Sequence, residues 1–274
     1  MPPLLFDLAL AKRLELAERQ AAVEGAETLA RLRPGAAAAG EPLAGGMAIF
    51  CGVNSPITQA VGIGLDGPVS EAEIGRLEEF YFSRGDAVRV ELCPLADASV
   101  LEQFGKRGYS VTEFSNMMAR PIAPCERWPA PAPGIVIERT GPDEAELWTR
   151  TVAQGFAEQF PVTPELLEVM QMFALAPRAE CYLARVGGEI AGGGCVALRE
   201  GVAGLFGAST LPTFRKRGVQ TALLHARLAR AAAAGCDLAA CIALPGSISQ
   251  RNILRQDFQT LYTRVKFEKP LPSR

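Results

Sequence analysis

The stretch Phe206–Leu224, FGASTLPTFRKRGVQTALL, decides how the second half of this chain folds. Small residues typical of a strand lead to Pro212, and a cation-rich turn ends at Gly218, where a helix rich in alanine and leucine begins. The start of a helix presents unpaired backbone N–H groups and the positive end of the helix dipole, so it favours an anion. Gly218 lets the backbone approach that anion, and the cations Arg215, Lys216 and Arg217 add charge. The stretch therefore predicts a phosphate or pyrophosphate site between a strand and a helix.

The spacing of the turn residues discriminates between the folds that use such a site. The chain has no G-x-x-x-x-G-K-[ST] and no G-x-G-x-x-G after the strand, which disfavours a P-loop and a dinucleotide-binding fold. It has Arg215-x-x-Gly218-x-Gln220 instead. This pattern resembles the coenzyme A loop of the GNAT acetyltransferases, [QR]-x-x-G-x-[GA]. Gln220 departs from the small residue at the last position of the family pattern.

The order of the segments after this loop strengthens the resemblance. A helix over about 217–234 is followed by a strand-like run at 237–243, a short helix and terminal strands, as in the second half of the GNAT fold. Ser249-x-x-Asn252 in the short helix is similar to a subset of the family in which the asparagine binds the pantetheine arm. The Gly-Phe that usually follows this helix is replaced by Asp257-Phe258.

The resemblance implies an acetyl-CoA site formed by the loop, the helix start and the short helix. The expected coenzyme contacts are Ser209, Thr210, Arg215, Lys216, Arg217, Gly218, Val219, Gln220, Thr221, Asn252 and Arg255. It also implies direct attack of an amine on the thioester, with the backbone amide of Thr210 donating to the thioester oxygen. An ordinary surface role stays open for Asn252 and for Arg255.

The sequence does not identify the acid and base of such a reaction. Many family members reprotonate the leaving thiolate with a tyrosine in the short helix, and that position holds Ile253 here. Tyr262 and Glu158 are weak catalytic candidates, and a packed aromatic and a solvated acid are their ordinary interpretations. The thiolate can take its proton from water, because thiols are far more acidic than alcohols. We interpret the single histidine, His225, as structural or partly exposed.

Composition bounds the class of protein. The 274 residues suffice for two domains, and the net charge of −2 disfavours a nucleic-acid partner. Seven cysteines without C-x-x-C or zinc-type spacing predict free thiols in a reducing compartment and no metal. The N-terminal run makes a poor signal peptide, and no run approaches the roughly 18 apolar residues that span a bilayer. We expect a cytoplasmic protein without a membrane partner, and the abundant alanine and arginine indicate a bacterial source.

Residues 121–134 mark the clearest boundary, because their prolines sustain neither a helix nor a central strand. We expect a Pro-rich linker there and a GNAT acetyltransferase domain at 135–274. Residues 1–120 are expected to form a degenerate GNAT-like domain that lacks the coenzyme loop. The predicted fold class is therefore α/β (α+β), with a mixed, mostly antiparallel GNAT-type sheet flanked by helices in two tandem domains.

The evidence for a degenerate copy lies in the order of its segments. A helix is expected over 4–33, a helix end and strand at 80–92, a short helix at 94–109 and a strand at 112–120. The last three follow the order of the second half. Where Arg-x-x-Gly would stand, the acidic segment 65–73 would repel a pyrophosphate. The first half is therefore expected to be structural or to form a wall of the acceptor site.

Three functions are compatible with these patterns. The first is an N-acetyltransferase that moves an acetyl group from acetyl-CoA to a primary amine of an unidentified small-molecule acceptor. The second is a non-catalytic acyl-CoA-binding or regulatory protein, which Ile253 and Gln220 keep open. The third, an unrelated phosphate-binding domain, is disfavoured by the downstream order. A homodimer is an assembly that the sequence leaves open.

Overall fold

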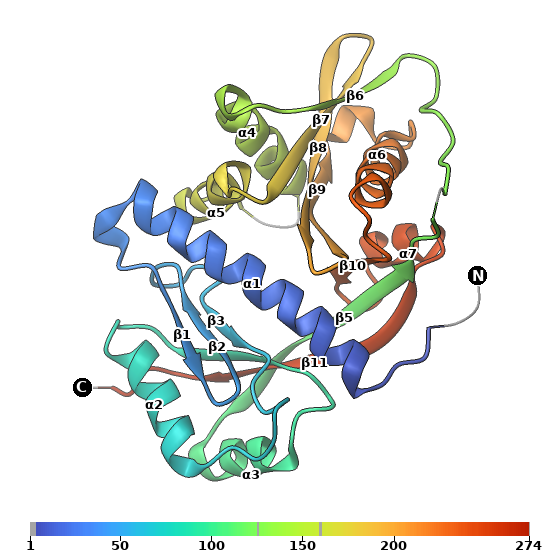
Figure 1. Ribbon diagram of the computed structural model, residues 1–274. Coiled ribbons are helices and arrows are strands. Elements are labelled where there is room, and N and C mark those ends of the chain that lie inside the picture. The colour runs from blue at the N-terminus through green and yellow to red at the C-terminus, as the bar shows by residue number, and fades with distance from the viewer. Residues whose placement is uncertain (1–3, 125, 159–160, 274) are drawn as a thin grey trace. The chain divides into compact units, whose positions relative to one another are not determined.

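The structure is a computed structural model that describes residues 4–124, 126–158 and 161–273. The chain forms two compact units (Figure 1). Unit 1 comprises Met1–Arg120 together with Ile242–Arg274, and unit 2 comprises Pro121–Cys241. The division after residue 120 lies at the expected boundary. Residues 242–274, which we expected in the second domain, instead pack with the first.

Unit 1 is built around a sheet whose strands follow the order β1-β2-β3-β4-β11-β5. β3 and β4 run parallel, and β11 is antiparallel to both β4 and β5. The expected two terminal strands thus form one strand, β11, which takes its place between β4 and β5. The elements of unit 1 are α1 (Leu8–Leu32), η1 (Pro34–Ala36), β1 (Ala39–Leu43), β2 (Gly46–Phe50), β3 (Gln59–Val61), α2 (Glu71–Phe82), β4 (Val88–Leu92), α3 (Ala98–Arg107), β5 (Ser110–Pro121), α7 (Ile248–Leu254) and β11 (Gln259–Lys269).

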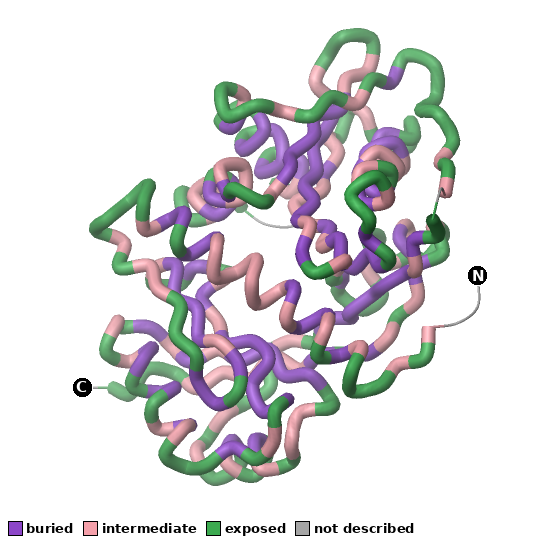
Figure 2. Tube along the Cα trace, viewed as in Figure 1, coloured by how far each residue is buried: buried purple, intermediate pink, exposed green. Residues whose placement is uncertain are grey.

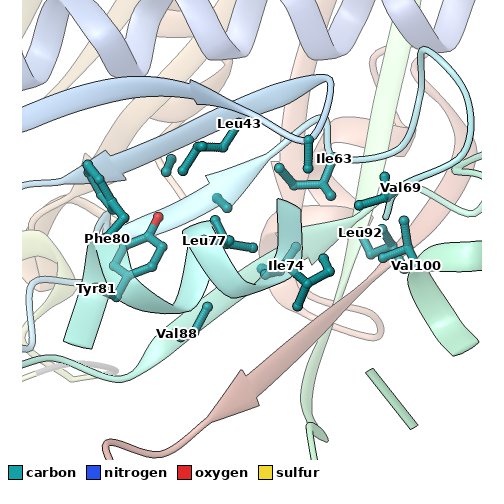
Figure 3. Close-up of a cluster of buried hydrophobic side chains, with 14 of the residues drawn as sticks. Leu43, Ile63, Val69, Ile74, Leu77, Phe80, Tyr81, Val88, Leu92 and Val100 are labelled. Carbon is teal, nitrogen blue, oxygen red and sulfur yellow. The ribbon is translucent and has the colours of Figure 1, made fainter. Parts of the chain in front are cut away.

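The two faces of this sheet are distinguished by alternate residues of β4, since successive side chains of a strand point to opposite faces. Val88, Val90 and Leu92 belong to a buried apolar cluster with residues of α2 and α3 (Figure 3). Within that cluster the Tyr81 hydroxyl accepts from the Ile49 N–H at 3.1 Å and donates to the Ile49 carbonyl at 3.2 Å. Helix α2 is thereby fixed to strand β2.

The opposite face carries a buried charge network under α1. Arg264 of β11, whose side chain is 0% exposed, pairs with Glu15 at 2.8 Å, with Glu91 at 3.0 Å and with Glu18. The Tyr262 hydroxyl donates to Glu15 at 2.8 Å. Removing one partner from such a buried network leaves uncompensated charge, so the network holds α1, β4 and β11 together. This is the physical reason why the end of the chain belongs to unit 1.

Unit 2 is built around strands that pair in the order β10-β9-β8-β7-β6. β10 is parallel to β9, and the remaining neighbours are antiparallel. The elements of unit 2 are β6 (Ile135–Arg139), η2 (Pro142–Glu144), α4 (Ala145–Phe156), α5 (Pro164–Leu175), β7 (Ala179–Val186), β8 (Glu189–Arg199), β9 (Val202–Thr210), η3 (Pro212–Phe214), α6 (Val219–Ala233) and β10 (Leu238–Ala243).

Helices cover both faces of these strands (Figure 1). A Cβ on Gly193 of β8 would meet Trp148 of α4 at 3.0 Å, whereas one on the next residue, Gly194, would meet Arg227 of α6 at 3.0 Å. Because adjacent residues face opposite ways, α4 and α6 lie on opposite faces. Strands β7 to β9 are mostly buried between them (Figure 2). The prediction of a mixed, mostly antiparallel sheet flanked by helices is confirmed.

The two units share an order of elements. In unit 1 the chain runs β1-β2-β3-α2-β4-α3-β5, and the later part of the chain runs β7-β8-β9-α6-β10-α7-β11. In both runs a helix, α2 or α6, connects two parallel strands. No helix in the described part of the chain is both long and apolar enough to cross a bilayer.

Candidate anion-binding site

The segment between β9 and α6 is a turn at the surface of unit 2, and residues 215–218 are exposed. Lys216 and Gly218 both adopt left-handed backbone conformations, with φ of 63° and 86°. A Cβ on Gly218 would meet only the Ile135 Cδ1 atom, at 3.8 Å, so space alone does not demand glycine there. The positive φ of Gly218, the residue before the helix, does favour glycine, because L side chains rarely adopt such a conformation.

The start of α6 is open to a ligand. Gly218 precedes the helix and provides no side-chain cap, and no acid lies in the first turn. The first hydrogen bond of the helix runs from the Ala222 N–H to the Gly218 carbonyl at 3.0 Å. Arg217 lies 5.6 Å from the ring centre of Phe214. Backbone donors, the positive dipole end and cations therefore meet at one exposed place, as an anion requires.

Arg215 does more than add charge to this turn. Its Nε donates to the Thr210 carbonyl at 3.3 Å, and its Nη2 donates to the Gly155 carbonyl at 3.3 Å. Its Nη1 is paired with the carboxylate of Glu158. The guanidinium thus contacts the end of β9, the end of α4 and the second residue after α4. Glu158, a catalytic candidate on sequence grounds, lies beside the loop as the partner of an arginine.

The end of β9 is packed closely on α4. The Ser209 hydroxyl donates to the Val152 carbonyl at 3.0 Å, and a Cβ on Gly155 would lie 2.2 Å from the Ser209 Oγ atom. The Ser209 side chain therefore has a structural role, and its coenzyme contact stays a prediction. The role of Gly155 was not predicted from the sequence. A glycine inside a helix costs about 1 kcal/mol relative to alanine, so its presence in α4 signals the close approach of another segment, here the end of β9.

A β-bulge precedes the loop. Gly193 pairs with Ser209 and Cys195 pairs with Phe206, so Gly207 and Ala208 together face one residue of β8. Gly207 adopts φ of 56°, a left-handed conformation that suits a bulge. Sequence reasoning did not predict this bulge, and the signal was the glycine inside the strand.

β9 also separates from β10 before the loop. The described pairing of β9 with β10 covers Val202–Gly204 and Leu238–Ala240, although β9 continues to Thr210. The bulge and this separation both change the path of the strand before it enters the turn.

The other predicted coenzyme contacts fall into two groups. Val219, Gln220 and Thr221 form the first turn of α6, and the Val219 side chain is buried, so only its backbone faces outward. Asn252 and Arg255 belong to unit 1, where the Arg255 Nη1 donates to the Asn252 Oδ1 at 3.5 Å at the end of α7. Their coenzyme contacts, and the role of the Thr210 amide, stay predictions.

The structure places Tyr262, a weak catalytic candidate, and His225, the single histidine. Tyr262 is buried in unit 1, stacks on Phe6 with ring centres 4.7 Å apart and donates its hydroxyl to Glu15. Burial raises its pKa, so the phenol is held in place and neutral. Its interpretation as a packed aromatic is the one the geometry favours. His225 is partly buried on α6.

The described cysteines are mostly buried thiols. Burial raises the pKa of Cys51 and of Cys241 to about 12, which keeps both thiols protonated at neutral pH and unreactive. Cys125 lies outside the described residues. No metal-binding group of three or more side chains occurs in the part of the chain that the structure describes.

Comparisons with known proteins agree with this architecture. Residues 146–256, from α4 through α7, match the family model described as Acetyltransferase (GNAT) family. No curated protein matches the chain.

Solved structures share the fold over most of the chain. A GCN5-related N-acetyltransferase from Kribbella flavida has a TM-score of 0.66 at 14% identity, covering 93% of this chain and 94% of that one. A tandem GNAT protein from the clavulanic acid biosynthesis pathway has a TM-score of 0.60 at 13% identity, covering 84% and 79%. A GCN5-related N-acetyltransferase from Sphaerobacter thermophilus has a TM-score of 0.51 at 20% identity, covering 69% and 61%. At these low sequence identities the structural similarity establishes the fold alone.

Proposed function

We propose, from the match of residues 146–256 to the GNAT acetyltransferase family model, that the protein is an acetyl-CoA-dependent N-acetyltransferase. The observation that carries the proposal is the start of α6, which is exposed, uncapped, free of acids in its first turn and flanked by cations. A diphosphate group is bound by this combination of donors and charge. We assign the coenzyme to unit 2 and take unit 1 as a degenerate copy of the same domain.

In the proposed reaction a primary amine attacks the carbonyl carbon of the thioester. A C–N bond forms, the C–S bond breaks, the amine releases a proton to water, and the thiolate takes a proton from water. The protein contributes proximity and a backbone donor to the thioester oxygen, which we assign to the amide of Thr210. Neither Glu158, engaged by Arg215, nor Tyr262, engaged by Glu15, is assigned an acid–base role.

The acceptor is proposed to be a small molecule with apolar character. Phe173 of α5 contacts Phe206 of β9 with ring centres 4.6 Å apart, next to the bulge that precedes the loop. Apolar and aromatic side chains at this position favour an apolar acceptor over a polycation. A cytoplasmic location, without nucleic-acid or membrane partners, belongs to the same proposal.

Calorimetric titration with acetyl-CoA tests the coenzyme assignment. Gly218→Asp places a carboxylate at the helix start on a left-handed backbone, and we expect it to weaken binding about 10- to 100-fold. Gly235→Asp is the matched control, because Gly235 follows the other end of α6 with φ of 78°. Retained affinity in Gly218→Asp would show that the loop is not the binding site.

Release of free thiol from acetyl-CoA in the presence of a panel of amines tests the reaction itself. Release with one or more amines is the expected result. Binding without release across the panel would favour the alternative function, a non-catalytic acyl-CoA-binding or regulatory protein. Ile253, which stands at the position of the usual tyrosine, is the observation that keeps this alternative in view.

A further inference from the structure

We propose that Arg215 and Glu158 form a brace that positions the anion loop against helix α4, and that Glu158 thereby strengthens binding of the diphosphate group. This inference rests on the proposed function and concerns the same site. It makes Arg215 and Glu158 positioning residues: Arg215 acts through the shape of the loop, and the ligand is met by other groups.

The contacts of Arg215 carry the inference. Its Nε and both Nη atoms are engaged, by the Thr210 carbonyl, by the Gly155 carbonyl and by the Glu158 carboxylate. These acceptors lie on three segments: the end of β9, the last turn of α4 and the second residue after α4. A planar guanidinium can satisfy several acceptors in fixed directions, which a lysine ammonium cannot do in the same way. Arg215 therefore joins three segments through one rigid group.

The contact with Gly155 has a further physical reason. The last carbonyls of a helix lack partners within the helix and form the negative end of its dipole. α4 has no basic residue in its own last turn. Arg215 supplies from the loop the cation that usually stabilises such an end. The short turn from β9 to α6 thus connects the negative end of one helix to the positive start of another.

In this arrangement the loop cations have different roles. Because three of the five N–H donors of Arg215 are engaged within the protein, we assign the anion to the helix start, Lys216 and Arg217. Lys216 is exposed, and its left-handed backbone is held between the braced Arg215 and the start of α6. A loop that is fixed before binding loses less conformational freedom on binding, which raises affinity.

The two possible roles of Arg215 predict opposite effects of Glu158→Gln. If Arg215 bound the diphosphate directly, Glu158 would compete for it, and removing the carboxylate would tighten binding. If Arg215 is a brace, the same change frees the loop and weakens binding. Removal of a nearby negative charge by itself favours an anion, so weaker binding would have to arise from the loss of the brace.

Calorimetry with acetyl-CoA distinguishes these roles. We expect Glu158→Gln to weaken binding about 3- to 10-fold, and Arg215→Lys to weaken it at least as much although the charge is kept. Glu146→Gln is the matched control, because Glu146 also lies on α4 and forms an exposed ion pair, with Arg150 at 2.7 Å. This control should leave affinity unchanged. Tighter or unchanged binding in Glu158→Gln overturns the brace.

Hydrogen exchange on the ligand-free protein provides a second, independent readout. Amides in the last turn of α4 and in residues 211–218 should exchange faster in Glu158→Gln than in the wild-type protein or in Glu146→Gln. Unchanged exchange in both segments contradicts the brace. Should the wild-type protein fail to bind acetyl-CoA, the proposed function fails, and the exchange rates still decide whether the brace exists.

Discussion

Helices α2 and α6 occupy the same place in the two runs of elements, and their starts differ in how each satisfies its backbone donors. In α2 the Ser70 hydroxyl accepts from the Glu73 N–H at 3.3 Å, and the Glu73 carboxylate accepts from the Ser70 N–H at 2.8 Å. This backbone bond lowers the pKa of Glu73. α6 begins after Gly218 with no such cap. The fold supplies the helix start, and two residues decide whether the chain caps it with an acid of its own.

The same contrast extends to the arginines of the two units. Unit 1 buries Arg264 among carboxylates of α1 and β4, so its charge is satisfied internally. Unit 2 also buries an arginine, Arg227, which donates to the Cys195 carbonyl, but it carries three further cations on the exposed loop before α6. The buried arginines therefore stabilise the fold of each unit, and the exposed loop cations distinguish unit 2.

The largest expected effect comes from breaking the internal charge of unit 1. Arg264→Met leaves Glu15 buried without its cation and removes one of the two cations paired with Glu91, which should reduce the free energy of unfolding by about 3–5 kcal/mol. Denaturant titration measures the loss. Lys266→Met is the control on the same strand, since Lys266 is partly exposed and pairs with Glu91 at 3.3 Å and with Glu113 at 3.1 Å. A loss no greater than that of the control would show that Arg264 is not essential to unit 1.

A second change gives α6 the acid that α2 has. Thr221 occupies the position in α6 that Glu73 occupies in α2, the third residue of the helix. Thr221→Glu should lower the affinity for acetyl-CoA about 10- to 100-fold, because its carboxylate competes for the helix start. Ala233→Glu, at the far end of the same helix, controls for net charge. Equal affinity of the two variants in calorimetry would contradict the assignment of the anion to the helix start.

A third change removes the side-chain cap at the start of α2. Ser70→Ala removes the cap and should lower the free energy of unfolding by about 1 kcal/mol, without producing affinity for acetyl-CoA. The second part follows because the acids Glu71 and Glu73 remain in the first turn. Ser83→Ala at the other end of α2 is the control and should have a smaller effect. Acquired coenzyme binding by unit 1 would break the comparison between the two helices.

The smallest expected effect concerns pH. Burial raises the pKa of Glu18 above its value in the unfolded chain, and the paired Arg264 opposes this shift. The proton is therefore bound more tightly in the folded state, so the stability it contributes is present at low pH and is lost as pH rises through the folded pKa. Denaturant titration across this range should show the wild-type protein losing stability relative to Glu18→Gln. A constant difference between the two proteins would contradict a raised pKa.

Local sequence patterns predicted the elements well where the signal lies within one segment. The acidic first turn of α2, the glycine before α6 and the glycine-ended helix α3 are all set by residues adjacent in the chain. Capping and left-handed glycines depend on neighbours within a few residues, so they can be recognised without the fold. The loop of the candidate site was predicted for the same reason.

Long-range pairings were not predictable in this way. Glu158 and Arg215 are 57 positions apart, and nothing in either segment indicates that they pair. From the sequence alone, Tyr262 is a catalytic candidate. The structure shows that its hydroxyl donates to Glu15, which lies 247 positions away. Such partners are selected by packing, which depends on the whole fold.

The sequence by itself determined the start of α6 after Gly218, the cations of the turn before it and the acidic segment 65–73 in the first half. Each depends on backbone conformation and charge within a short segment. Only the tertiary structure decided that residues 242–274 complete unit 1 and that Arg215 is held by α4. Strand pairing and ion pairing join residues far apart in the chain. Several strands or charged residues could serve as the partner on sequence grounds, and only the packing of the folded chain selects one of them.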